Sequence, residues 1–320
     1  MRVLVTGGCG FIGSAFLLEH IRAFPEDEIL CFDKMTYAAN ADIPDIASKM
    51  SGSFRFVRGD IADKETVFAA FADFRPEAVV NFAAETHVDR SIEDPAPFVR
   101  SNVNGTSVLL EACIKYSVPR FHQVSTDEVY GEYLGIPEGG FTEDSALCPS
   151  SPYAATKAAA DMITLSYFRT YGLFVTITRG ANTYGERQFP EKLIPKTIKL
   201  AVRGEKIPVM GDGRARRDWL YVSDHVHAIE SVLRDGQPGW IYNVPGETEA
   251  ENIDIVRRVL DLIGDKRDLI SFVPERAGHD IRYLVSGKRI ASLGVRNKVT
   301  LTHGLAHTVR WYLNYYRNIR

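Results

Sequence analysis

The stretch RVLVTGGCGFIG at residues 2–13 decides the fold of this chain. An apolar strand is predicted at 3–5, and Gly7, Gly10 and Gly13 follow it in a GxxGxxG pattern that leads into a helix. Glycines at this spacing permit a tight turn and a close approach of the backbone to a pyrophosphate, while the helix N-terminus offers free N–H groups. The stretch therefore predicts a dinucleotide-binding turn at the carboxyl end of the first strand.

Strands and helices alternate through the first half of the chain. Further strands are predicted at 28–33, 54–57, 78–82, 120–125 and 174–179, and helices at 15–23, 64–74, 97–116 and 152–171. The last of these helices has Ser151 as its N-cap, Pro152 at its first position and Gly172 just after its end. This alternation predicts an α/β fold with a Rossmann-like doubly wound parallel sheet and helices on both faces.

After Gly180 the pattern is less regular, because prolines and glycines interrupt it. Helices are predicted at 191–202, 224–233, 253–263 and 304–316, and strands at 219–222 and 240–244. We expect residues 1–180 to form the dinucleotide-binding domain, with strands returning to it from about 217–244. Residues 181–320 are expected to form mainly a smaller α/β substrate-binding lobe.

The bulk composition excludes several classes of protein. A net charge of -3 over 320 residues argues against a nucleic-acid partner, and no apolar run is long enough to cross a membrane. The cysteines have no CxxC pair and no metal-ligand spacing, so we expect no metal site and a reducing, cytoplasmic setting without a signal peptide. These cysteines are Cys9, Cys31, Cys113 and Cys148.

The acid Asp33 ends the second predicted strand, about 20 residues beyond Gly13, where a carboxylate can bind the adenosine ribose hydroxyls. Such an acid repels a 2′-phosphate, so NAD is favoured over NADP, although the neighbouring Lys34 would tolerate the phosphate. Asp60 follows the third strand and can hydrogen-bond the adenine, or it is an ordinary loop acid. The alternative for the whole motif is a structural glycine turn beside a surface acid.

Two groups of residues have the pattern of a catalytic site. Tyr153 and Lys157 lie four apart on a predicted helix, so the ammonium can favour a phenolate that accepts a proton from a substrate hydroxyl. Thr126, Asp127 and Glu128 end the strand that begins at 120, and adjacent carboxyl groups there can act as acid and base. The alternative for Tyr153 and Lys157 is an exposed pair on a helix, and the alternative for Asp127 and Glu128 is a pair of solvated loop acids.

At these residues the chain resembles the extended short-chain dehydrogenase/reductase family, and within it the dTDP-glucose 4,6-dehydratases. The matching segments are TGGCGFIG (6–13), DKMTYAAN (33–40), NFAAETHVDRSI (81–92), STDEVYG (125–131), SPYAATKAAAD (151–161), FPEKLIP (189–195), RDWLYVSDH (217–225) and GHDIRY (278–283).

The resemblance implies a reaction and a role for each group. It implies that Thr126 hydrogen-bonds the sugar C4 oxygen near Tyr153, that Asp127 protonates the departing C6 hydroxyl and that Glu128 removes the C5 proton. The net change is loss of water, a lyase reaction in which NAD is recycled. It also implies further cofactor contacts from Phe11, Ile12, Lys34, Thr36, Ile61 and Ala83.

For the nucleotide-diphosphate hexose, the resemblance implies diphosphate contacts from Arg217 and Arg276. Its other implied substrate contacts are His87, Arg90, Thr126, Asn182, Lys192, Leu193, Asn252 and His279. For each charged residue alone, a surface salt bridge is the alternative. Several residues depart from the dehydratase pattern: Ala181, Thr183, Glu186, Arg187, Met210, Pro245 and Ser286. Of these, Met210 and the 181–187 loop are expected near the nucleotide and sugar, so they leave the base and the hexose open.

Other functions remain as alternatives at this stage. A UDP-glucose or other NDP-hexose 4,6-dehydratase, a nucleotide-sugar 4-epimerase or decarboxylase, and an NAD-bound regulatory protein without activity would share parts of these motifs. The adjacent acids argue against an epimerase, which needs no acid–base pair for elimination. The resemblance also implies a homodimer formed through the helices at 97–116 and 152–171.

Overall fold

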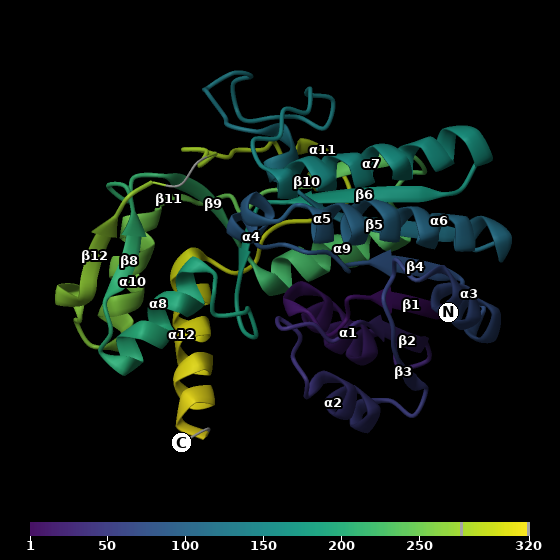
Figure 1. Cartoon of the computed structure of the whole chain (residues 1–320), viewed down its shortest axis with the longest axis horizontal. Coiled ribbons are helices and arrows are strands. Elements are labelled where there is room, and N and C mark those ends of the chain that lie inside the picture. The colour runs from purple at the N-terminus through teal and green to yellow at the C-terminus, as the bar shows by residue number, and fades with distance from the viewer. Residues whose placement is uncertain (276–277, 319–320) are drawn as a thin grey trace.

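The computed structural model describes residues 1–275 and 278–318, and its main layer is a seven-stranded sheet (Figure 1). All its neighbouring strands run parallel, in the order β10-β6-β5-β4-β1-β2-β3. The strands are β1 (Arg2–Thr6), β2 (Glu28–Asp33), β3 (Phe54–Arg58), β4 (Ala78–Asn81), β5 (Arg120–Thr126), β6 (Val175–Gly180) and β10 (Trp240–Val244). The strand order reverses between β1 and β4, and in such sheets ligands bind beyond the carboxyl ends at that point.

Helices cover both faces of this sheet, so the predicted fold class is confirmed (Figure 1). One face packs against α1 (Phe11–Ala23), α2 (Ile43–Met50) and α9 (Val222–Asp235). The other face packs against α3 (Lys64–Phe74), α6 (Thr106–Lys115) and α7 (Pro152–Tyr171). Residues of β1 alternate between the two cores, with Val3 and Val5 in one and Leu4 in the other, because successive side chains of a strand point to opposite faces.

The structure confirms the predicted caps of the helix at 152–171 and differs from the prediction at two other helices. The Ser151 hydroxyl accepts a hydrogen bond from the Ala154 N–H at 3.1 Å, and Gly172 ends α7 at φ +70°. The first helix begins earlier than predicted, at Phe11, because Gly13 already belongs to its first turn. The helix predicted at 97–116 contains a π turn. Its parts are α5 (Ala96–Phe98), η1 (Val99–Gly105) and α6, and α4 (Val88–Glu93) precedes them.

A smaller group of elements stands beside the carboxyl ends of the main sheet (Figure 1). It contains a three-stranded sheet in the order β11-β9-β7 and the parallel pair β12-β8. The strands are β7 (Asn182–Tyr184), β8 (Ile207–Met210), β9 (Arg216–Tyr221), β11 (Glu249–Glu251) and β12 (Ile270–Val273). The helices of this group are α8 (Leu193–Arg203), α10 (Asn252–Ile263) and α12 (Leu301–Asn318), with the short turn η3 (Arg267–Leu269). The short turn η2 (Asp127–Tyr130) follows β5, and α11 (Lys288–Ala291) packs against β10 of the main sheet.

Of the two later strands predicted at 219–222 and 240–244, only the second joins the main sheet. Strand β10 pairs with β6, as expected, whereas the strand predicted at 219–222 pairs with β7 and β11 instead. Its aromatic residues Trp219 and Tyr221 pack with Tyr184 in a core formed with α8, α10 and α12, which holds this strand away from the main sheet. The division of the chain at residue 180 stays a prediction.

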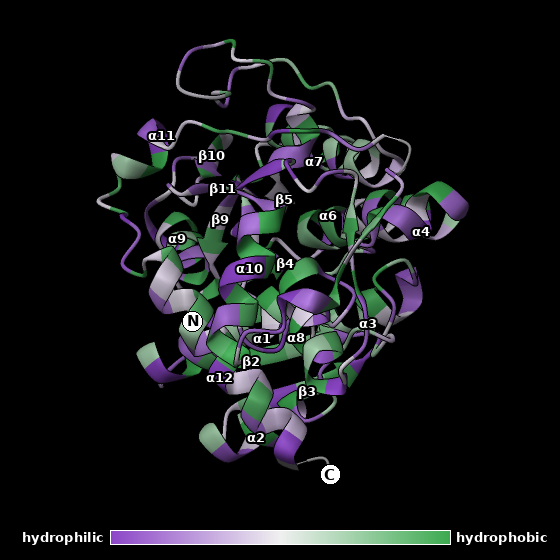
Figure 2. Cartoon of the chain, turned by 90° about the vertical axis from the view of Figure 1, so that its left-hand side faces the viewer, coloured by the Kyte–Doolittle hydropathy of each residue, from purple (hydrophilic) through white to green (hydrophobic). Residues whose placement is uncertain are grey.

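The helices of this smaller group are amphipathic. In α8 the buried residues Ile194, Thr197, Ile198 and Ala201 recur at helical spacing, and Figure 2 shows hydrophilic and hydrophobic residues on different sides of these helices. Within residues 1–275 and 278–318, no helix combines the length and apolar character needed to cross a membrane.

Candidate active site

The glycine turn between β1 and α1 is packed too closely for side chains. Gly7 has φ +66°, and a Cβ atom there would lie 2.6 Å from the Ala83 nitrogen. A Cβ on Gly13 would lie 2.2 Å from the Gly7 carbonyl oxygen. A side chain on Gly7 would meet the backbone that follows β4, and one on Gly13 would meet the turn itself, so the backbone approach needed by a pyrophosphate depends on glycine.

The acid Asp33 is held at the end of β2 by backbone donors. Its carboxylate accepts hydrogen bonds from the Cys9 N–H at 2.9 Å and the Met35 N–H at 2.7 Å. Burial raises the pKa of Asp33, and these two donors oppose that effect. The side chain is thus fixed in orientation while each oxygen keeps a second lone pair for a ligand hydroxyl.

The neighbouring Asp60 forms a small charge cluster. The Lys34 ammonium and the Arg100 guanidinium each lie 3.0 Å from its carboxylate. Partial burial acts to raise the pKa of Asp60, but the Ala62 N–H and Lys34 hold it below its usual value. The Lys34 ammonium is therefore paired with the Asp60 carboxylate, next to Asp33.

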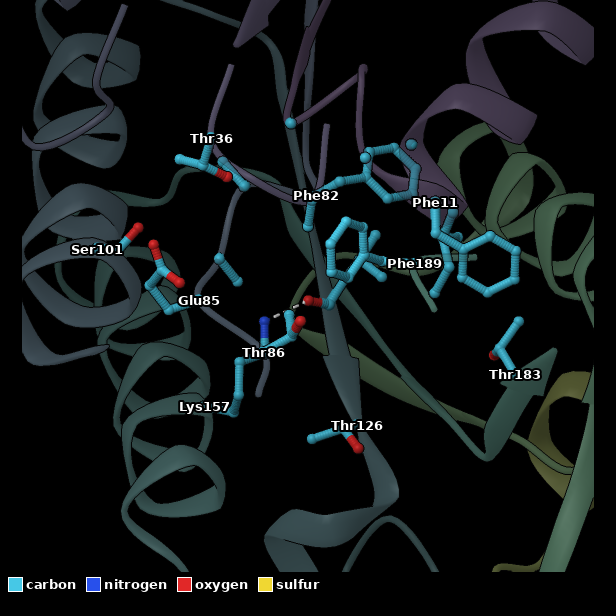
Figure 3. Close-up of a pocket in the computed structure, with 18 of the residues that line it drawn as sticks. Phe11, Thr36, Phe82, Glu85, Thr86, Ser101, Thr126, Lys157, Thr183 and Phe189 are labelled. Atoms are coloured by element: carbon cyan, nitrogen blue, oxygen red, sulfur yellow. Dashed lines mark hydrogen bonds between the residues drawn. The ribbon is translucent and has the colours of Figure 1, made fainter. Parts of the chain in front are cut away.

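A single cavity runs from the glycine turn to the ends of β5 and β6 (Figure 3). Every residue predicted to bind the cofactor lies in its lining, as do Thr126 at the end of β5 and Asp127 and Glu128 at the start of η2. The cofactor set is Gly7, Gly10, Phe11, Ile12, Gly13, Asp33, Lys34, Thr36, Asp60, Ile61, Ala83, Tyr153 and Lys157. The structure therefore brings the predicted cofactor and catalytic residues together in one place, while their roles stay predictions.

Tyr153 and Lys157 both face this cavity from α7 and both are buried. The Lys157 ammonium donates a hydrogen bond to the Val124 carbonyl at 2.7 Å, and burial lowers its pKa to about 8. Burial and the Glu128 carboxylate raise the pKa of Tyr153, and a hydrogen bond with Thr126 partly opposes them. A nearby positive charge in the cavity would act against this rise and favour the phenolate.

Thr126, the last residue of β5, leads directly into Asp127 and Glu128, the first residues of η2. The Thr126 hydroxyl accepts a hydrogen bond from the Glu128 N–H at 3.3 Å and lies 3.5 Å from an Asp127 oxygen. Asp127 is 2% exposed, and its Oδ2 has no hydrogen-bond partner among the described residues. Burial, followed by Glu128, raises the pKa of Asp127 well above its usual value, so it is suited to deliver a proton.

Two of the predicted substrate residues beyond Thr126, Asn182 and Lys192, also line the cavity. The Asn182 Oδ1 is buried without a partner among the described residues, and Lys192 donates to the Thr86 carbonyl at 3.0 Å. His87 lies 3.5 Å from a Glu191 oxygen. These contacts draw the 189–192 loop onto the segment that follows β4.

Other predicted substrate residues lie outside the described lining of this cavity: His87, Arg90, Leu193, Arg217, Asn252 and His279. Arg217 is buried and donates to the carbonyls of Arg216, Ile281 and Asp280, and its guanidinium lies over the Tyr283 ring. The Arg90 guanidinium lies 3.8 Å from the centre of the Tyr37 ring. These six side chains do not line the cavity, but the Arg217 charge acts to lower the pKa of Asp127, so its guanidinium is within electrostatic range of the acid–base turn. Their roles toward a substrate stay predictions. Arg276 lies outside the described residues.

Several lining residues were not predicted individually. They are Phe82, Glu85, Thr86, Ser101, Gln188, Phe189, Glu191 and His225. Most lie inside motifs that the sequence analysis quoted, but the motif alone does not say which letters face a cavity. His225 is buried, its Nδ1 lies 2.8 Å from the Thr183 hydroxyl, and burial lowers its pKa to about 4, so it is neutral near pH 7.

Comparison with known proteins agrees with this arrangement. A family described as GDP-mannose 4,6 dehydratase matches residues 4–308. The dTDP-glucose 4,6-dehydratase of Streptomyces niveus is 45% identical, over 98% of this chain and 93% of the relative. The low-salt glycan biosynthesis protein Agl12 of Haloferax volcanii is also 45% identical, over 98% and 99%. The dTDP-glucose 4,6-dehydratase DesIV of Streptomyces venezuelae, crystallised with NAD, superposes with a TM-score of 0.93 at 43% identity, over 98% and 97%.

Proposed function

This chain belongs to the GDP-mannose 4,6-dehydratase family of extended short-chain dehydrogenases/reductases, and from that premise we propose that it is an NAD-dependent nucleotide-sugar 4,6-dehydratase. Its substrate is an NDP-glucose, dTDP-glucose in our proposal, and its products are the NDP-4-keto-6-deoxyglucose and water. The observation that carries this proposal is the buried Asp127, whose pKa is raised, in one cavity with Glu128, Tyr153 and the glycine turn.

The residues present fit NAD. The glycine turn offers a cradle that a Cβ on Gly7 or Gly13 would fill, and Asp33 presents fixed carboxylate oxygens to ribose hydroxyls. Asp33 also disfavours a 2′-phosphate, and the Lys34 ammonium is held by Asp60. When bound, NAD supplies the hydride acceptor for C4 and the hydride donor for C6.

In the first half of the reaction, Tyr153 removes the proton of the C4 hydroxyl as the hydride leaves C4. Thr126 lies beside Tyr153 and holds the same oxygen. The Lys157 ammonium supports the phenolate that this step requires. The product of the step is a 4-keto sugar, whose C5 proton is acidic because the carbonyl is adjacent.

In the second half, Glu128 takes the C5 proton while Asp127 gives its proton to the C6 hydroxyl. The C6–O bond breaks, water leaves, and a C5–C6 double bond conjugated with the ketone remains. Hydride returns to C6 and a proton to C5. The raised pKa of Asp127 favours this role, since a carboxylic acid that keeps its proton near pH 7 can protonate a poor leaving group.

The choice of nucleotide, the oligomeric state and the cellular setting belong to the same proposal. The curated relatives favour dTDP-glucose, and Met210 at the end of β8, with the 181–187 loop, is where this chain would adjust the choice of base or hexose. Apolar side chains exposed on η1, α6 and α7 support a homodimer through these helices: Val99, Ile114, Met162 and Tyr171. The Cys9 and Cys31 thiols lie 3.9 Å apart and unbonded, which supports a reducing, cytoplasmic setting.

The test is a product assay with matched substrates. The purified enzyme is incubated in parallel with dTDP-glucose, UDP-glucose and GDP-mannose, and the products are examined by proton NMR. We expect a C6 methyl doublet next to a 4-keto group with dTDP-glucose. A product that keeps its C6 hydroxymethyl group with inverted C4 would identify an epimerase. Binding of NAD without turnover of any nucleotide hexose would favour a regulatory protein.

A further inference from the structure

A second buried charge lies on α7 one helical turn beyond Lys157. Asp161 is 0% exposed, and one of its oxygens accepts a hydrogen bond from the Arg179 Nε at 2.9 Å. Its other oxygen, Oδ1, is buried and has no hydrogen-bond partner within the described part of the chain. Because residues four apart share a helix face, this carboxylate lies on the same side of α7 as Lys157.

Arg179 connects this carboxylate to the acid–base turn. It is 1% exposed on β6, and its Nη1 donates to the Tyr130 hydroxyl at 2.8 Å. The Tyr130 hydroxyl in turn donates to the Asn243 Oδ1 on β10 at 2.8 Å. Tyr130 ends η2, the turn that begins with Asp127. The network therefore joins the helix of the tyrosine–lysine pair to the turn of the two acids.

The network contains two buried cations and one buried carboxylate. The buried carboxylate of Asp161 lies 2.9 Å from the buried Arg179 guanidinium, and it shares a helix face with the buried Lys157 one turn earlier. We propose that Asp161 is a positioning residue for the reaction: it is the counter-ion that keeps Lys157 cationic beside Tyr153. In the same proposal, Arg179 anchors that counter-ion to η2. The proposal deepens the dehydratase function of the same site and rests on it.

The electrostatics of the site agree with this geometry. Burial lowers the pKa of Lys157 to about 8, and Asp161 is the charged group that acts to raise it. Asp161 also acts to raise the pKa of Tyr153, more weakly than burial, Glu128 and Asp127 do. Removal of the Asp161 charge would therefore lower both pKa values. The titratable groups facing this site are Tyr153 and Lys157 on α7, Asp127, Glu128 and Tyr130 on η2, and Arg179 on β6.

The test is the pH profile of 4-keto product formation by Asp161→Asn in the NAD-loaded enzyme. Loss of an opposite charge at this range lowers a pKa by roughly one unit or more. The alkaline limb should therefore move down by about one pH unit, with about fivefold loss at pH 8 and less than about twofold loss at pH 6. The conservative variant Asp161→Glu should restore the position of the limb.

Controls separate this effect from a purely structural one. Tyr130→Phe cuts the link between Arg179 and β10 without removing a charge, so its limb should stay in place even if its rate falls. Asp254→Asn repeats the substitution at an exposed site on α10 and should match the wild type. Should Asp161→Asn fail to fold, Asp161→Asn/Arg179→Gln removes the unpaired guanidinium as well and should still move the limb to lower pH.

Two results would overturn the inference. One is a loss of activity in folded Asp161→Asn, or in the double variant, that is equal at every pH. The other is an alkaline limb that stays where the wild type has it. With an active wild type, either result leaves the dehydratase function standing. A wild type that forms no 4-keto product would instead remove the proposed function, and this inference with it.

Discussion

Replacing Asp127 by asparagine should separate the oxidation of the sugar from the loss of water. Asparagine keeps the size of the side chain in a site that is only 2% exposed, so we expect the turn at β5 to stay folded. It cannot deliver a proton to the C6 hydroxyl. Tyr153, Lys157 and Glu128 remain, so oxidation at C4 and removal of the C5 proton should continue.

The size of the effect follows from the state of Asp127 in the structure. Burial, followed by the nearby Glu128 carboxylate, raises its pKa well above the usual value, which favours the protonated acid that the proposed role requires. General acid catalysis contributes about 10²- to 10⁴-fold to a rate. The dehydration rate of Asp127→Asn should fall by that factor, which corresponds to about 3–5 kcal/mol in the barrier.

The assay uses heavy water and mass spectrometry. The wild type in D₂O should form the 4-keto-6-deoxy product. With Asp127→Asn, the recovered NDP-glucose should gain a deuterium at C5, because Glu128 exchanges that proton and the hydride then returns to C4. Glu128→Gln is the matched control and should show neither dehydration nor exchange.

One result would refute the reasoning. If Asp127→Asn dehydrated the sugar within about tenfold of the wild-type rate, the proton for C6 would come from another group. An Asp127→Asn enzyme that neither dehydrates nor exchanges C5, while still binding NAD, would show that the residue also serves the oxidation step.

Three further outcomes follow from the structure. Gly13→Ala places a Cβ 2.2 Å from the Gly7 carbonyl, so NAD affinity by calorimetry should fall at least about tenfold, and unchanged affinity would contradict the close-packed turn. Asp33→Ser should raise affinity for NADP relative to NAD, measured by competition, and an unchanged ratio would show that Asp33 does not face the ribose. Burial lowers the pKa of His122 to about 3 and of His225 to about 4, below the usual 6.5. Their protons bind to the unfolded chain first, so the free energy of unfolding should decrease as pH falls from 6.5 to about 4, by up to about 1.4 kcal/mol per pH unit for each histidine. His122→Gln, in urea titrations over this range, should show a shallower decrease.

Local patterns were sufficient for the framework of the fold. The glycine turn, the alternation of strands and helices and the cap at Ser151 depend on neighbours in the chain, and the structure confirms the elements they predicted. Short elements such as α2 and β7 were not predicted, because a few residues carry too little periodicity to stand out.

The candidate catalytic residues could also be predicted from their local spacing and the family resemblance. Tyr153 and Lys157 lie four apart on one helix, and Asp127 and Glu128 are adjacent in the chain, so each pair is visible without a fold. That the two pairs meet in one cavity, and that burial raises the pKa of Asp127, depends on β5, β6 and α7 packing together. Burial is a property of this packing and has no counterpart in a linear pattern.

The amino-acid order alone thus predicted the class of fold and the glycine turn, because these rest on backbone geometry and short spacings. The roles of the acid–base residues came from the family resemblance and stay proposals. Only the folded structure shows that β9 pairs outside the main sheet and that Arg217 donates hydrogen bonds to backbone carbonyls. It was also needed to find the carboxylate of Asp161 paired with Arg179 behind Lys157. These features join residues distant in sequence, and the free energy of burying their polar groups together arises only when the chain is folded.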